Sequence, residues 1–191
     1  MDSRQTLEEL QEQFRSGSTN AMPLAGMIVW AALGVAAFFV APPVLSNLAL
    51  YVMAAILPLA FLIDKARGRN LFAGGDDPLT KLFLTSIIGI ALSVPLVVIG
   101  VSGSDNHTLM TLGMAVLAGV IWITYGWAAN DPVGLRHAIG RGIGCYLAYA
   151  FTPEPFRATA ICAIVVLAYA YSLIFMLRTG QSFAESSSAK T

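Results

Sequence analysis

Two arginines and a histidine stand at the head of an otherwise apolar segment, in the stretch GLRHAIGRGIG at residues 134–144. They are Arg136, His137 and Arg141. Arginine presents a planar fork of N–H donors that matches a carboxylate or a phosphate, and histidine changes charge near neutral pH. The chemistry that these side chains could perform is therefore the binding of an anion.

A depth estimate leaves two interpretations of these residues open. If a helix begins at Pro132, a rise of about 1.5 Å per residue places Arg141 roughly 13 Å from its start. Arg136 and His137 would reach lipid head groups, and Arg141 could extend its long stem back to them. The three residues then either set the membrane topology or line a cytoplasm-facing polar pocket inside a helix bundle.

The same segment carries a pattern with a period of four residues. His137, Arg141, Cys145 and Tyr149 drift slowly around one side of the helix. Beside them runs a stripe of small residues, which lets a second helix approach closely. The predicted helix-packing residues are Gly140, Gly144 and Ala148. The candidate ligand-binding residues are Arg136, His137, Arg141, Tyr146, Tyr149 and Trp122.

The composition indicates a membrane protein that would hold this segment. Of 191 residues, 57% are hydrophobic and 12% are charged, whereas soluble domains carry about 25% charged residues. A bilayer core roughly 30 Å thick needs about 20 apolar residues per helix. The sequence predicts an all-α bundle of six transmembrane helices over residues 22–178. The predicted spans are 22–41, 46–64, 79–101, 108–128, 133–151 and 157–178.

Short sequence signals mark where helices begin outside and between these spans. Thr6 and Glu9 have the spacing of a capping box. They predict a short amphipathic helix within residues 1–21, whose acidic face favours docking onto protein rather than onto anionic lipid. Asp77 and Asp131 each precede a proline, which is typical of a helix start. Residues 179–191 are predicted to form a flexible cytoplasmic tail.

The distribution of lysine and arginine predicts the orientation. With a cytoplasmic N-terminus and six spans, only Arg157 falls on the outer side. We therefore expect a multi-pass membrane protein with both termini in the cytoplasm. The residues expected on the cytoplasmic side are Arg4, Arg15, Lys65, Arg67, Arg69, Lys81, Arg136, Arg141, Arg178 and Lys190.

Several function classes are disfavoured by what the sequence lacks. The predicted spans hold no Asp or Glu near their middles, whereas proton-coupled pumps usually carry a buried carboxylate. No HExxH, GxSxG, paired-cysteine metal motif or phosphate loop is present. An enzyme, a metal site and a cofactor are therefore not expected, and zero net charge gives no reason to expect nucleic acid. Cys145 and Cys162 are expected to be reduced.

Four short motifs lie in the predicted spans or in the cytoplasmic loop between the second and third: an Ala-Gly and a Trp, a Pro-Leu, an Asn-Leu-Phe-Ala and an Asp-Pro-Leu. They comprise Ala25, Gly26 and Trp30; Pro58 and Leu59; Asn70, Leu71, Phe72 and Ala73; and Asp77, Pro78 and Leu79. In these motifs the chain resembles a bacterial family of small six-helix integral membrane proteins of unknown function. Thr124–Tyr125 keeps half of the family's Pro-Tyr motif, and the arginine-rich start of the fifth span has no counterpart. The resemblance covers about two-thirds of the chain and implies an architecture and a bacterial origin, without an activity.

A second resemblance concerns size and orientation only. In both respects the chain is similar to the six-helix substrate-capture subunits of vitamin importers. Those proteins typically show an Ala-x-x-x-Ala pair in the first span, and Ala32 and Ala36 have that spacing.

Two functional hypotheses follow. In the first, an integral inner-membrane protein binds or transports a small molecule or lipid through a cytoplasm-facing cavity with a basic lining. Its partners would be membrane lipids and an anionic small molecule or lipid head group. In the second, a structural or regulatory protein meets a protein partner through its N-terminal helix and the loop at residues 64–81. A homo-oligomer is compatible with both.

Overall fold

The computed structural model describes residues 5–69 and 77–188, with side chains of the last helix described to Met176. This part of the chain is helical and contains no strand, as the sequence predicts. The motif Asn70–Ala73 lies outside the described residues. The seven helices are α1 (Leu7–Gly17), α2 (Ala21–Ala36), α3 (Pro42–Ala66), α4 (Pro78–Ser102), α5 (Thr108–Ala128), α6 (Pro132–Phe151) and α7 (Arg157–Ser188).

The predicted helix starts are confirmed in atomic detail. At α1 the Thr6 hydroxyl accepts a bond from the Glu9 backbone N–H, and the Glu9 carboxylate accepts one from the Thr6 N–H. At α4 and α6 the carboxylates of Asp77 and Asp131 each accept a hydrogen bond from a backbone N–H, 2.8 Å away in both cases. These bonds satisfy donors that a helix N-terminus otherwise leaves without partners.

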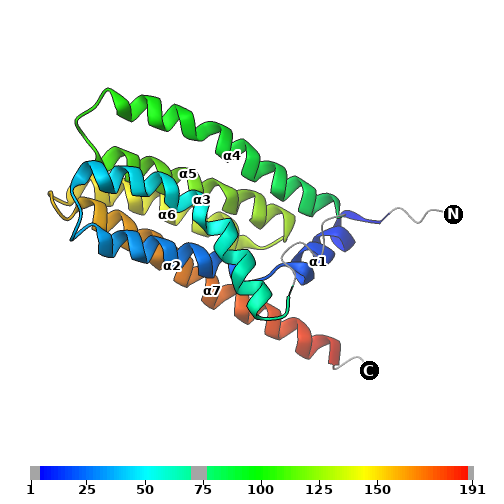
Figure 1. The fold of residues 1–191 in the computed structure, drawn as a ribbon. Helices are drawn as coiled ribbons and strands as arrows, with labels where there is room; N and C mark the ends of the chain where they lie inside the picture. The colour runs from blue at the N-terminus through cyan, green and yellow to red at the C-terminus, as the bar shows by residue number, and fades with distance from the viewer. Residues whose placement is uncertain (1–4, 70–76, 189–191) are drawn as a thin grey trace.

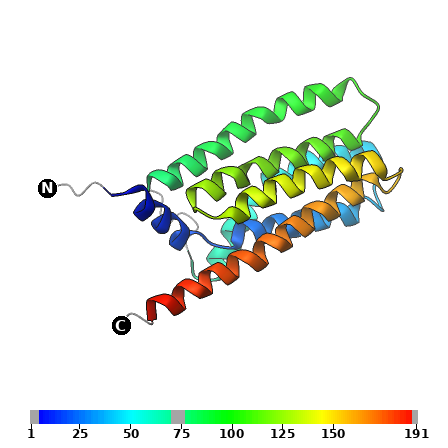
Figure 2. The same cartoon turned by 180° about the vertical axis from the view of Figure 1, so that it is seen from behind.

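Helix α5 is the central element of the bundle. It packs against α3, α4, α6 and α7, while α2 fits between α3 and α7, and α6 lies against α7 (Figures 1 and 2). Helix α1 and the last described turns of α7 lie at the same end of the bundle (Figure 1). Because α6 packs against both α5 and α7, its polar segment lies between two apolar helices.

Helix α1 docks onto the end of the bundle, as expected from its acidic polar face. Its one buried side chain, Phe14, packs against Phe83 of α4 and Tyr125 of α5, with ring centroids 5.9 and 6.1 Å apart. The Gln11 amide donates to the Trp127 carbonyl oxygen over 2.9 Å. Aromatic packing and one polar bond thus fix α1 across the ends of α4 and α5.

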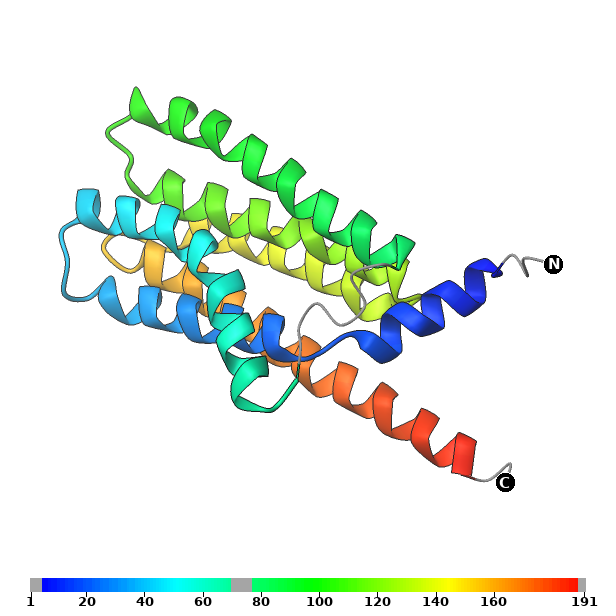
Figure 3. The same cartoon turned by 45° about the vertical axis from the view of Figure 1, so that its right-hand side comes forward.

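Helices α3 and α4 stand apart from each other. Helix α3 bends partway along its length (Figure 3) and contains Pro58, which removes one backbone hydrogen bond. Helix α4 packs only against α5 and α1 among the helices described, and Leu79 is its only buried residue. The side of the bundle between α3 and α4 is consequently open.

Length and composition make four helices suitable for crossing a membrane: α3, α4, α5 and the stretch Arg157–Met176 of α7. The pair of α1 and α2, bent by 52°, makes a fifth candidate. Helix α2 has only 16 residues, and α6 is less apolar because of its arginines, histidine and glycines. Helix α7 continues to Ser188, through residues that the sequence analysis assigns to the tail.

Glycines allow the closest helix crossing in the bundle, between α5 and α6. A Cβ atom at Gly134 would lie 2.4 Å from the Trp122 carbonyl oxygen and 2.5 Å from the Gly126 Cα. In the predicted stripe on α6, Gly144 faces Ile164 of α7, whereas a Cβ at Gly140 would meet nothing within 4 Å. On α6 the close contact with α5 therefore lies at Gly134, six residues before the first glycine of that stripe.

A pair of glycine-to-alanine changes tests this crossing. Gly134→Ala should destabilise the fold by about 1–3 kcal/mol, since the added methyl group meets backbone atoms that cannot rotate away. Gly140→Ala, on the same helix but in open space, should be neutral or stabilising by up to about 1 kcal/mol. Thermal unfolding in detergent measures both. Equal losses of stability would contradict the assignment of the crossing to Gly134.

Candidate functional site

The inner face of α6 carries three polar or sulfur-containing residues into the bundle. His137, Arg141 and Cys145 follow one another at intervals of four residues, which places them on one side of a helix. Their exposed fractions are 1%, 0% and 0%. Of the three residues that sequence analysis proposed for an anion site, His137 and Arg141 therefore lie in the interior.

Arg141 lies between aromatic rings from two other helices. Its guanidinium carbon is 5.4 Å from the ring centroid of Trp30 in α2 and 5.2 Å from that of Tyr169 in α7. On the α5 side, Gly119 leaves room for the arginine stem, because a Cβ there would lie 3.3 Å from the Arg141 Cδ. Three neighbouring helices, α2, α5 and α7, thus contact one charged side chain of α6.

The guanidinium has no hydrogen-bond acceptor among the residues that the structure describes. Nε, Nη1 and Nη2 of Arg141 are all buried and without a partner, and so is Nε1 of Trp30. A buried unpaired charge costs several kcal/mol, whereas a cation–π contact returns about 0.5–2 kcal/mol. The two aromatic rings therefore offset only part of the cost of burying Arg141.

His137 is held in place by contacts on both sides of its ring. It stacks on Trp122 of α5 with ring centroids 4.0 Å apart and planes at 14°, and meets the edge of Tyr169 at 5.1 Å. Its Nδ1 is 2.7 Å from the Ser172 hydroxyl oxygen of α7. Its Nε2 is buried without a partner. The histidine thus has a fixed orientation and one unused polar atom.

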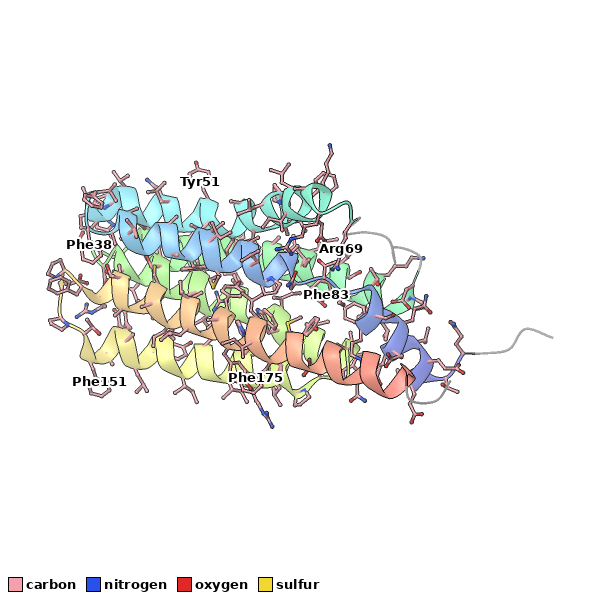
Figure 4. All side chains as sticks on the ribbon, turned by 90° about the horizontal axis from the view of Figure 1, so that it is seen from below. Phe38, Tyr51, Arg69, Phe83, Phe151 and Phe175 are labelled. Atoms are coloured by element: carbon pink, nitrogen blue, oxygen red, sulfur yellow. The ribbon has the colours of Figure 1, made fainter. Side chains whose placement is uncertain are left out.

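A cavity of about 190 Å³ adjoins this cluster on the open side of the bundle. Helix α1 contributes Phe14 at one end, close to Phe83, which Figure 4 labels. Most of the wall is apolar, and Asp77 is its one charged residue among those described. The apolar wall includes Met53, Ile56 and Leu57 of α3; Leu84, Ile87 and Ile90 of α4; and Ala118 and Ile121 of α5.

Two aromatic side chains belong both to the cavity and to the buried cluster. Trp122 and Tyr169 line the cavity, and both also contact the His137 ring. Tyr169 additionally touches the Arg141 guanidinium. Tyr169 therefore contacts both the apolar cavity and the buried cation.

The sequence-predicted ligand-binding residues fall into two groups. His137, Arg141 and Trp122 come together in the buried cluster. Arg136 and Tyr146 are exposed on other sides of α6. Tyr149 lies toward the far end of the bundle, where its hydroxyl accepts a bond of 2.6 Å from the Asn106 amide.

Sequence analysis missed Tyr169, Ser172 and Asp64. Tyr169 and Ser172 are polar residues inside the predicted sixth span, and a polar residue in a span is itself a signal of function. Asp64, near the end of α3, is fully buried and accepts a 2.7 Å bond from the Thr19 hydroxyl. Its position at a helix end gave no indication of burial.

Both cysteines are buried and free, in agreement with the expected reduced state. Cys145 lies one turn beyond Arg141 on α6, and Cys162 on α7 lies close to Gly34 of α2, where a Cβ would be 3.0 Å from the Cys162 Cβ. Both thiols belong to the main core of the bundle. They act there as small apolar side chains.

Replacing Arg141 by an apolar residue of similar length tests whether it stabilises the fold. Arg141→Met should leave the unfolding temperature unchanged or raise it, because it removes an unpaired buried charge. Ser172→Ala should cost about 1 kcal/mol, because it removes the buried hydrogen bond between the Ser172 hydroxyl and Nδ1 of His137. Thermal unfolding of the purified protein compares them. A loss of stability in Arg141→Met as large as that in Ser172→Ala would make Arg141 a structural residue.

The model of a family described as a family of unknown function, DUF7010, matches residues 7–178. No curated protein and no solved structure matches the chain. The family match extends well past the motifs at residues 25–79 and fits their resemblance to a family without an assigned activity. The chain therefore belongs to the DUF7010 family of unknown function.

Proposed function

We propose that the protein crosses the bacterial inner membrane six times and binds an amphipathic molecule that enters its cavity from the lipid phase. The observation that carries this proposal is the cavity of about 190 Å³ with its largely apolar wall on the side where α3 and α4 stand apart. In a membrane, that side would face acyl chains. The ligand would therefore bind without leaving the bilayer.

The packing of the bundle supports six spans. Helix α2 lies against α3 and α7, and α6 lies against α5 and α7. These three neighbours, α3, α5 and α7, have the length and composition of membrane helices. A membrane that α3, α5 and α7 cross would enclose α2 and α6 as well. Polar side chains of α6 would avoid lipid because they point into the bundle, as intramembrane charges usually do.

The ends of the bundle differ in a way that supports cytoplasmic termini. Lys65, Arg67, Lys81 and Arg136 belong to helix ends beside α1. At the other end Arg157 has a carboxylate of Glu154 at 3.2 Å. Exposed Phe38 and Phe151 lie at that same far end, and Arg69 lies nearer α1 (Figure 4). Basic residues mark the cytoplasmic side, and aromatic rings suit a membrane interface.

A matched pair of serine-to-cysteine changes tests this topology. In a Cys145→Ala and Cys162→Ala background, Ser102→Cys at the far end of α4 should react with a membrane-impermeant thiol reagent in intact cells. Ser16→Cys in α1 should react only after the membrane is opened. Both serines are exposed, so accessibility alone would not separate them. Labelling of Ser16→Cys in intact cells would overturn the cytoplasmic placement of α1.

Quenching of tryptophan fluorescence by lipids with brominated acyl chains tests the cavity. Trp122 lines the cavity, whereas Trp30 is fully buried elsewhere in the core and is absent from the wall described above. In variants that keep one tryptophan each, Trp122 should be quenched clearly more strongly than Trp30. The reason is that a brominated acyl chain that enters the cavity comes close to the Trp122 ring, whereas it does not reach Trp30.

Filling the cavity provides the control. Ala118→Leu, within the wall, should reduce quenching of Trp122, whereas Ala163→Leu, on the exposed side of α7, should leave it unchanged. Thermal unfolding of both variants checks that the bundle is intact. If Trp122 is quenched no more than Trp30, or if Ala118→Leu has no effect, the cavity does not admit acyl chains. A specific protein partner would then be the better hypothesis.

A further inference from the structure

We infer that the molecule bound in the cavity carries an oxyanion, a carboxylate or a phosphate monoester, and that Arg141 is its counterion. This inference rests on the proposed function and adds the chemical class of the ligand. It starts from the charge on Arg141, which no carboxylate of the described residues balances. The buried carboxylates Asp64, Asp77 and Asp131 each hold a hydrogen bond near a helix end instead.

The unused polar atoms around Arg141 define the chemistry of the missing group. Arginine has five N–H donors, and all three of its side-chain nitrogens lack acceptors in the part of the chain that the structure describes. Nε1 of Trp30, beside the guanidinium, is a further unused donor. A group that only accepts and has two or more oxygens matches this set. Carboxylate and phosphate have that form, and both bind arginine through two parallel hydrogen bonds.

The position of the cavity supplies the remaining part of the ligand. Its apolar wall suits an acyl chain, and Tyr169 both lines it and touches the guanidinium. A turn of the Tyr169 ring would bring a head group in the cavity against Arg141. Tyr169 is closely packed on α2, where a Cβ at Gly26 would lie 2.3 Å from its Cζ. The ring also contacts Trp122 and His137, so such a turn requires these neighbouring rings to move with it.

The charges at the two ends of the cavity determine which way the ligand is oriented in it. Asp77, the charged residue of its described wall, lies at the end that α1 covers. An oxyanion at that end would meet a carboxylate, whereas an oxyanion at the inner wall would meet Arg141 beyond the Tyr169 ring. The head group should therefore point toward α6 and the chain toward the gap between α3 and α4.

The test compares ligands of one chain length on the full-length protein in detergent. The probes are hexadecanoate, hexadecanol and a lysophosphatidate with the same acyl chain, and isothermal titration measures their binding. Hexadecanoate or the lysophosphatidate should bind clearly more tightly than hexadecanol, which has the same chain without the charge. The two acids distinguish a carboxylate from a phosphate as the preferred group.

Matched arginine variants assign the preference to one residue. Arg141→Met should weaken binding of the preferred acid about 30-fold or more, since it removes one member of a buried charge pair. Arg136→Met, the same change on an exposed side chain of α6, should leave binding unchanged. If Arg141→Met does not fold, Arg141→Lys replaces it. That variant keeps the charge without the fork, and its preference for acid over alcohol should shrink but persist.

The outcomes separate this inference from the proposed function. Equal binding of acid and alcohol, unchanged in Arg141→Met, would overturn the counterion while leaving amphiphile binding in place. Equal losses in Arg136→Met and Arg141→Met would also overturn it. Binding of none of the three probes, together with an unquenched Trp122, would overturn both.

Discussion

A single positive charge inside an apolar bundle is the constraint that explains most of the interior. Arg141 has no acceptor among the described residues, so its surroundings must reduce the cost of its burial by other means. Trp30 and Tyr169 do so through their ring faces, and Gly119 provides the space for its stem. Three neighbouring helices thus carry residues whose type is set by one side chain of α6.

The close approach of helices around that charge depends on small residues. Gly126 and Gly134 bring the backbones of α5 and α6 together, and Gly26 makes room for the Tyr169 ring. A larger residue at any of these positions would move an aromatic ring or a backbone that lies next to Arg141 or His137. A substitution that changes helix packing at these positions therefore also changes the surroundings of the buried charge.

Sequence analysis predicted the helices well because their signals are local. The capping box at Thr6 and the Asp-Pro starts at Asp77 and Asp131 need only neighbouring residues, and all three are present. The same is true of the spacing that places His137 and Arg141 on one face. Tyr169 could not be assigned to Arg141 in this way, because their contact depends on how α6 and α7 pack. The cavity was likewise beyond prediction, since it arises from the separation of α3 and α4, and its described wall contains no basic side chain.

The position of Arg141 relative to the cavity indicates a role in binding rather than in setting the membrane topology. A cation kept only to set topology would lie at the helix end, as exposed Arg136 does, where water and head groups solvate it cheaply. Arg141 lies five residues further along α6, about 1.4 turns deeper, fully buried and against a ring that also lines an apolar cavity. Stability alone does not favour that arrangement, because an apolar side chain would fill the same space without the cost of desolvation. An anionic partner that reaches the guanidinium from the cavity would balance the charge and use the donors that the bundle leaves unpaired.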